Sequence, residues 1–115
     1  MLVKVRNKDE FQDSVPFVFS HEGFEIVVLL HIKEFYAFNK DCPHAKGDLS
    51  KGRFENGSVT CLNHGLQFYL CNGNINTDEL DEDITDNIDL EILNKYVLKT
   101  YTVVAINNDI YIEFP

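Results

Sequence analysis

The sequence predicts an all-β fold built from short antiparallel strands. Apolar and aromatic residues recur in short runs, such as Phe24–Leu30, that turn residues interrupt every few positions. Two segments typical of tight hairpins, Asn56-Gly57 and Asn107-Asn108-Asp109, each stand between such runs. Helical periodicity is scarce by comparison. With 115 residues, the chain is long enough for one hydrophobic core, so we expect a single domain over residues 1–115.

Each expected element follows from its local sequence. The segment Asn7–Ser14 is polar with one apolar residue, Phe11, and an Asn or Asp cap there predicts a single helical turn. His21-Glu22-Gly23 is expected to turn the chain, because glycine adopts positive φ without strain. A short helix is expected at Asp89–Tyr96. The expected strands are Leu2–Arg6, Val15–Phe19, Phe24–Leu30, Phe35–Phe38, Arg53–Glu55, Ser58–Thr60, Val97–Ala105 and Ile110–Phe114.

The charge of the chain is concentrated in one segment. The net charge is −9, and eight of the nineteen acidic residues lie in Asp78–Glu91, where there is no Lys or Arg. The rest of the chain is nearly neutral, so a nucleic-acid partner, which needs a basic surface, is not expected. A solvated face is the simpler interpretation of the acidic segment, and a docking surface for a basic partner is the alternative.

Membrane insertion and export are not expected either. No apolar run approaches the roughly 20 residues that span a bilayer. The segment Met1–Arg6 alternates apolar and basic residues and lacks the apolar core of a secretion signal. We therefore expect a cytoplasmic protein.

Two short arms of the sequence carry metal-binding chemistry. The first is Cys42-Pro43-His44 and the second is Cys61-Leu62-Asn63-His64, with sixteen residues between them. Thiolate and imidazole together favour iron, zinc or copper over calcium or magnesium. Zinc fingers of the Cys₂His₂ type place both cysteines in one arm, whereas here each arm has one Cys and one His. This arrangement suits a two-iron site in which two Cys hold one iron and two His hold the other.

The residues around these arms resemble those of a Rieske iron–sulfur domain. The resemblance rests on Cys42–Gly52, Cys61–Gly65, Phe68 and Asn72-Gly73, and extends over most of the chain. It is strongest to the soluble Rieske-type ferredoxins of bacterial ring-hydroxylating dioxygenases and to small subunits of assimilatory nitrite reductase. It implies an antiparallel β-sandwich or open barrel with a cluster-binding subdomain at about residues 40–73. It also implies one [2Fe–2S] cluster with four ligands, Cys42, His44, Cys61 and His64.

The resemblance implies a one-electron carrier that passes electrons from a reductase to a terminal oxygenase or reductase. Such a carrier has redox proteins as partners and no small-molecule substrate. We do not expect an enzyme, because a Rieske oxygenase also needs a mononuclear iron held by two His and a carboxylate. Only His21 and His31 remain for it, and 115 residues leave no room for a second domain. Three alternatives stay open: a nitrite reductase small subunit, a zinc-binding interaction module and a redox sensor.

Differences between this sequence and respiratory Rieske proteins lead to a further expectation about the reduction potential. Respiratory Rieske proteins have an extra Cys in each arm and a Ser after the second His-Gly, whereas this chain has Gly47, Asn63 and Leu66 there. Fewer hydrogen bonds to sulfur predict a reduction potential toward the low end of the Rieske range. Cys71 matches no ligand spacing, so we expect a buried or strand-edge thiol without a metal.

Overall fold

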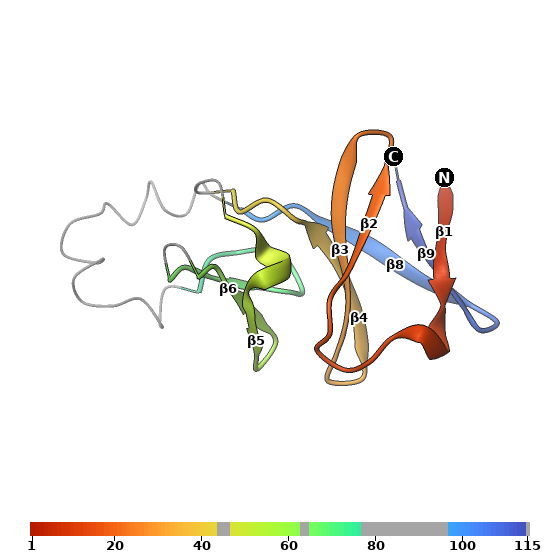
Figure 1. Ribbon diagram of the computed structural model, residues 1–115, viewed down its shortest axis with the longest axis horizontal. Coiled ribbons are helices and arrows are strands. Elements are labelled where there is room, and N and C mark those ends of the chain that lie inside the picture. Colours follow the sequence, from red (N-terminus) through yellow and green to blue (C-terminus); the bar gives the residue numbers. More distant parts are fainter. Residues whose placement is uncertain (44–46, 63–64, 77–96, 115) are drawn as a thin grey trace.

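The computed structural model describes residues 1–43, 47–62, 65–76 and 97–114, and it confirms the all-β prediction (Figure 1). The expected helix at Asp89–Tyr96 and the acidic segment Asp78–Glu91 lie outside these residues. One antiparallel sheet has the strand order β1 (Leu2–Asn7), β9 (Asp109–Glu113), β8 (Thr100–Ile106), β4 (Glu34–Asn39), β3 (Phe24–His31), β2 (Phe17–His21). A second antiparallel sheet has the order β5 (Arg53–Glu55), β6 (Ser58–Thr60), β7 (Gln67–Tyr69).

The six-stranded sheet curls until its outer strands meet at one end. The guanidinium carbon of Arg6 on β1 lies 3.9 Å from the ring centre of Phe17 on β2. The same carbon lies 4.4 Å from the ring centre of Phe11, which is buried between the two strands. Cation–π contacts of this kind are attractive at these distances. The sheet is therefore a nearly closed barrel, as expected from the sequence.

Strand β3 is buried on both faces, which explains why its sequence is apolar without alternation. Ile26 and Val28 point into the core of the barrel, together with side chains of β4 and β9. Val27 and Leu29 point the other way, into a second core that the three-stranded sheet and its loops cover. The interior of the barrel and the three-stranded sheet thus lie on opposite faces of β3.

The turns follow the sequence closely. Asn56 and Gly57 have φ of 51° and 80°, as the predicted type I′ hairpin requires. Asn7 caps a 3₁₀ turn at Lys8–Glu10, accepting a hydrogen bond from the Asp9 amide at 2.8 Å. Within the described ranges, none of the helices is long and apolar enough to cross a membrane.

Two expectations about strands were wrong, and one strand was missed. The second strand begins at Phe17 rather than Val15 and extends through His21, so His21 lies on a strand and not in a turn. Strand β8 begins at Thr100 rather than Val97, because the amide of Leu98 donates to the carbonyl of Gly73 instead of to a strand. Strand β7 was not predicted, because no Asn-Gly turn directly joins it to a neighbouring strand, as Asn56-Gly57 joins the equally short β5 and β6.

Candidate metal centre

The first arm begins a loop that follows β4 and whose base is closed by backbone contacts. Asp41 and Asp48, on either side of this loop, form an isolated antiparallel bridge. Inside this bridge the amide of Cys42 donates to the carbonyl of Gly47 at 2.9 Å. Cys42 and Gly47 are both buried. The loop therefore begins and ends at fixed points, and Cys42 stands at the first of them.

The root of this arm is also tied to the barrel. The ammonium group of Lys40 donates to the carboxylate of Glu25 on β3, and this hydrogen bond raises the pKa of Lys40. One residue earlier, the side-chain oxygen of Asn39 accepts from the hydroxyl of Tyr101 at 2.7 Å. Burial raises the pKa of Tyr101, so its hydroxyl stays protonated as a donor. Both contacts fix the direction in which the arm leaves the sheet.

Asp48 lies at the end of the loop that the first arm begins, where it caps a 3₁₀ turn. Its carboxylate caps the 3₁₀ turn η2 (Leu49–Lys51), accepting from the Ser50 amide at 3.0 Å and from the Ser50 hydroxyl at 2.5 Å. Burial alone raises the pKa of Asp48, but these hydrogen bonds and the nearby Lys40 and Lys51 outweigh it and hold the pKa below its ordinary value. The carboxylate is therefore ionised at neutral pH and keeps the cap formed.

The second arm is the connection between β6 and β7. The amide of Cys61 donates to the carbonyl of Leu66 at 2.8 Å, which closes the loop. Within it, the amide of Gly65 donates back to the carbonyl of Cys61 at 2.7 Å. Gly65 has a φ of +69°, in the left-handed region that glycine adopts most readily. Leu62, next to the cysteine, is 61% exposed.

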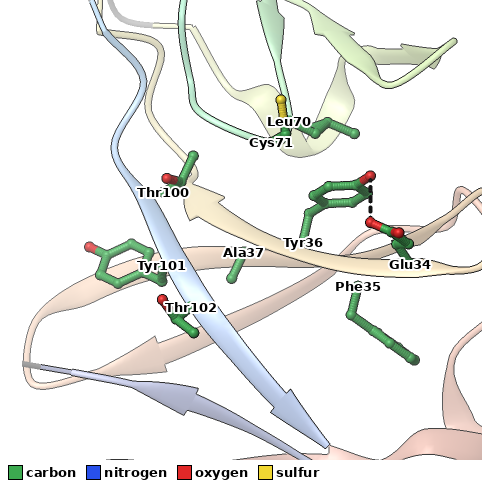
Figure 2. Close-up of a pocket in the computed structure, with 9 residues that line it drawn as sticks. All are labelled: Glu34, Phe35, Tyr36, Ala37, Leu70, Cys71, Thr100, Tyr101 and Thr102. Atoms are coloured by element: carbon green, nitrogen blue, oxygen red, sulfur yellow. Dashed lines mark hydrogen bonds between the residues drawn. The ribbon is translucent and has the colours of Figure 1, made fainter.

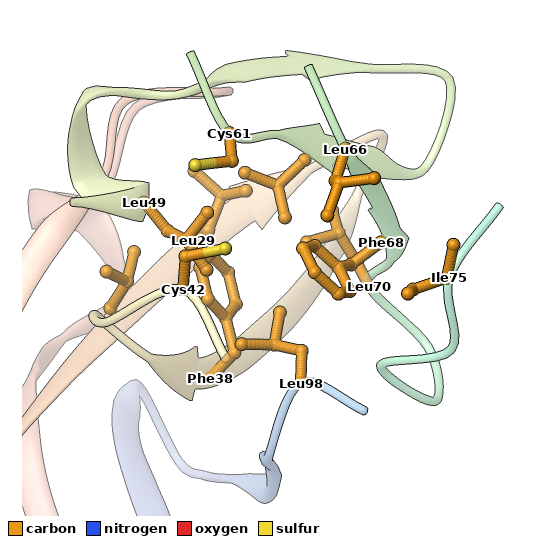
Figure 3. Close-up of a cluster of buried hydrophobic side chains, with 12 residues drawn as sticks. Leu29, Phe38, Cys42, Leu49, Cys61, Leu66, Phe68, Leu70, Ile75 and Leu98 are labelled. Atoms are coloured by element: carbon orange, nitrogen blue, oxygen red, sulfur yellow. The ribbon is translucent and has the colours of Figure 1, made fainter. Parts of the chain in front are cut away.

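The two arms bring their cysteines into one apolar cluster (Figure 3). Cys42 is 5% exposed and Cys61 is 1% exposed, and both belong to the core on the outer side of β3. Leu49 from beyond the first arm and Leu66 from the second complete the cluster around them. Two thiols from separate loops, shielded from water in this way, are donors of the kind that bind zinc, copper(I) or an iron–sulfur cluster.

Of the four predicted ligands, the described residues include Cys42 and Cys61, which belong to one buried cluster. His44 and His64 fall outside the described residues, so the predicted ligand set stays a prediction. Among the residues with described positions, no set of three His, Cys, Asp or Glu forms a further candidate metal site.

Cys71 lies apart from this cluster. It is exposed in the turn after β7, so the expectation of a buried or strand-edge thiol was wrong. Figure 2 shows it at the rim of a cavity of about 320 Å³ between β4, β8 and the Leu70–Cys71 segment. In this cavity the hydroxyl of Tyr36 donates to the carboxylate of Glu34 at 3.3 Å, and the pKa of Tyr36 is raised by burial and by that negative charge.

The two remaining histidines lie outside the arms. His21, on β2, packs against the rings of Phe19 and Phe114. His31, at the end of β3, is 4% exposed and both of its ring nitrogens have hydrogen-bond partners. Sequence reasoning missed the contact of His31 with the second sheet, although its position two residues after Leu29 places it on the same face as Val27 and Leu29.

Known proteins with the same architecture include two ferredoxins. The ferredoxin of carbazole 1,9a-dioxygenase from Nocardioides aromaticivorans IC177 has 22% identity and a TM-score of 0.75, over 96% of this chain and 95% of that one. A Sphingomonas yanoikuyae B1 ferredoxin has 17% identity and a TM-score of 0.75, over 98% of each chain. At such identities the likeness shows the fold. No curated protein sequence matches the chain.

A comparison with models of protein families shows to which family this chain belongs. The model of the Rieske [2Fe–2S] domain matches residues 1–101, which include both arms and the strands that carry them. Rieske domains bind a [2Fe–2S] cluster. Cys42 and Cys61, buried in one cluster, both lie within the matched residues. This chain therefore belongs to the Rieske [2Fe–2S] domain family.

Proposed function

We propose that this protein is a one-electron carrier whose cluster is held by Cys42 and His44 of the first arm and by Cys61 and His64 of the second. One observation carries this proposal: Cys42 and Cys61, from separate loops, lie buried in one apolar cluster. In each arm a histidine follows its cysteine by two or three positions. Two thiolates for one iron and two imidazoles for the other make a complete Rieske ligand set.

When bound, the cluster takes up and releases one electron. The protein's own residues hold the ligands rigidly for this purpose. The hydrogen bonds from Cys42 to Gly47 and from Cys61 to Leu66 fix the cysteine backbones at the bases of the two loops. Leu49 and Leu66 keep water away from the sulfur side of the site. A rigid, dry ligand set limits the rearrangement that accompanies each change of charge.

We further propose that a terminal oxygenase accepts the electron and that a reductase supplies it. The comparison supports the oxygenase, because one similar structure is a complex of reduced oxygenase and oxidized ferredoxin in carbazole 1,9a-dioxygenase. That chain has 19% identity to this one and a TM-score of 0.74, over 96% of this chain and 91% of that one. We place the exchange in the cytoplasm, where reducing conditions keep ligand thiols available for iron.

Metal analysis of the purified protein tests the carrier. We expect two irons and two acid-labile sulfides per chain, and an EPR signal with a low average g after dithionite reduction, as two His ligands on one iron produce. Zinc in place of iron, or the absence of this signal after reconstitution, would contradict the proposal. Rapid mixing of the reduced protein with an oxidised terminal oxygenase then tests the direction of transfer. We expect the cluster absorbance to recover, and no recovery would rule out that acceptor.

A further inference from the structure

The side chain of His31 lies where the two sheets meet. It ends β3, the strand that both cores share, and it is 4% exposed. Two residues earlier on the same strand, Leu29 packs into the core beneath the arms. His31 therefore points toward the three-stranded sheet, because alternate residues of a strand face the same side.

The hydrogen bonds of His31 fix its protonation pattern. The ring nitrogen Nε2 accepts from the backbone amide of Gly57 at 3.0 Å. An amide can only donate, so Nε2 holds a lone pair and the proton is on Nδ1. Nδ1 lies 2.8 Å from the hydroxyl oxygen of Ser14 and donates to it. The Ser14 hydroxyl in turn donates to the carboxylate of Asp13 at 3.1 Å.

Two backbone turns lie beside the imidazole. Ser14 has a φ of 60°, in the left-handed region that non-glycine residues rarely adopt, and Ile32 and Lys33, with φ of 49° and 65°, form the two-residue turn between β3 and β4. The second oxygen of the Asp13 carboxylate accepts from the amide of Ile32 at 3.0 Å, so one carboxylate holds both turns. The surrounding residues thus determine the orientation of the ring.

Gly57 connects this network to the second arm. It is in the turn between β5 and β6, and its carbonyl accepts from the amide of Leu70 at 2.9 Å, just beyond β7. Strand β6 then runs from Ser58 to Thr60, directly into Cys61. A displacement at Gly57 is therefore passed along one short strand to a predicted ligand.

We propose that His31 is a positioning residue, whose neutral imidazole sets the three-stranded sheet and the second arm in place against the barrel. The contact with Gly57 is independent of any metal, whereas its effect on the cluster rests on the proposed function. The two parts can be tested separately, by amide exchange and by the properties of the bound cluster.

Two substitutions distinguish the hydrogen bond of Nε2 from that of Nδ1 in His31. In His31→Gln the amide oxygen reaches the place of Nε2 and can accept from Gly57, whereas in His31→Asn the shorter side chain can reach only Ser14. We expect His31→Asn to speed hydrogen exchange at the Gly57 amide roughly tenfold, the change expected for one lost hydrogen bond. It should also shift the midpoint potential and speed iron release to a chelator. His31→Gln should remain close to wild type in all three measurements.

The same measurements can overturn the inference. Unchanged Gly57 exchange in His31→Asn would show that the contact positions nothing. Equal effects in both variants would show that His31 only fills space. If His31→Asn fails to fold, Ser14→Ala replaces it, since the ring then loses the hydrogen-bond partner of Nδ1 that holds it in place. Faster Gly57 exchange in that variant supports the inference, and unchanged exchange contradicts it. If no preparation contains iron, the proposed function fails, but Gly57 exchange still tests the contact.

Discussion

Gly73 and Leu98 approach so closely that no side chain fits between them. The amide of Leu98 donates to the carbonyl of Gly73 at 2.8 Å, and a Cβ on Gly73 would lie 1.9 Å from the carbonyl oxygen of Leu98. This contact joins the segment after β7 to the segment before β8. The buried side chain of Leu98 packs in the same core as Cys42 and Cys61.

A Gly73→Ala substitution should be strongly destabilising. Gly73 has a φ of +78°, and the added methyl group would also collide with backbone. The left-handed conformation costs about 1–2 kcal/mol and overpacking about 1–3 kcal/mol, so we expect a loss of about 2–5 kcal/mol in urea denaturation. Gly23→Ala is the matched control, because Gly23 has a φ of +86° with nothing within 4 Å of the added atom. Equal losses in the two variants would contradict the steric argument.

Serine substitutions should distinguish the three cysteines. We expect Cys42→Ser and Cys61→Ser to lose most of the bound iron and the visible absorbance, because each removes a proposed thiolate ligand. Cys71→Ser should keep both, since Cys71 is exposed and outside the core that contains Cys42 and Cys61. Iron content per chain, measured after anaerobic purification, checks this prediction. Iron loss in Cys71→Ser alone would overturn the ligand assignment.

Acidification should destabilise the fold, because it protonates the Asp48 carboxylate that caps the turn η2. The pKa of Asp48 is lower in the folded protein than its ordinary value of 3.8, so its ionised form stabilises the fold. This contribution is fully present above pH 3.8 and is lost as the pH falls through the lower, folded-state value. We expect Asp48→Ala to lower the free energy of unfolding at pH 7 by about 1 kcal/mol, as the loss of a helix cap does.

Asp48→Asn is the control for this effect, since asparagine also caps helices but cannot ionise. It should retain most of the stability at pH 7. The difference between wild type and Asp48→Asn should shrink as the pH falls below 3.8 and through the lower, folded-state pKa of Asp48. A difference that instead grew toward acid would show that the sign of the pKa shift is wrong.

The midpoint potential should fall in the lower half of the Rieske range of about −150 to +300 mV. Leu66, directly after Gly65, is 2% exposed, and its side chain donates no hydrogen bond to stabilise the extra electron. Protein-film voltammetry at pH 7 measures the potential. A value near the top of the range would mean that groups other than the residue 66 side chain control it.

Local signals predicted the fold well because the strands here are bounded by strong turns. The Asn56-Gly57 pair predicted a hairpin, and both residues have positive φ. The apolar run of β3 predicted a strand but not that both of its faces are covered, since that depends on a sheet formed by residues far along the chain. The start of β8 was misplaced because Gly73, 25 positions before Leu98, takes the hydrogen bond of Leu98.

The site was predictable only in part. Spacing singled out Cys42 and Cys61 as proposed ligands, and the structure brings both into one buried cluster. The spacing gave no indication of the contact between His31 and Gly57, which are 26 positions apart. Such a contact becomes visible only when the packing of the two sheets is known.

The double burial of β3 has a consequence for engineering. Alternate side chains of β3 face different cores. Val27 and Leu29 belong to the core that contains the cysteines, whereas Ile26 and Val28 belong to the interior of the barrel. Arms transplanted from another Rieske protein would meet the first pair and leave the second untouched. The arms and the three-stranded sheet could therefore be exchanged on one side of β3, while the barrel core on its other side keeps its packing.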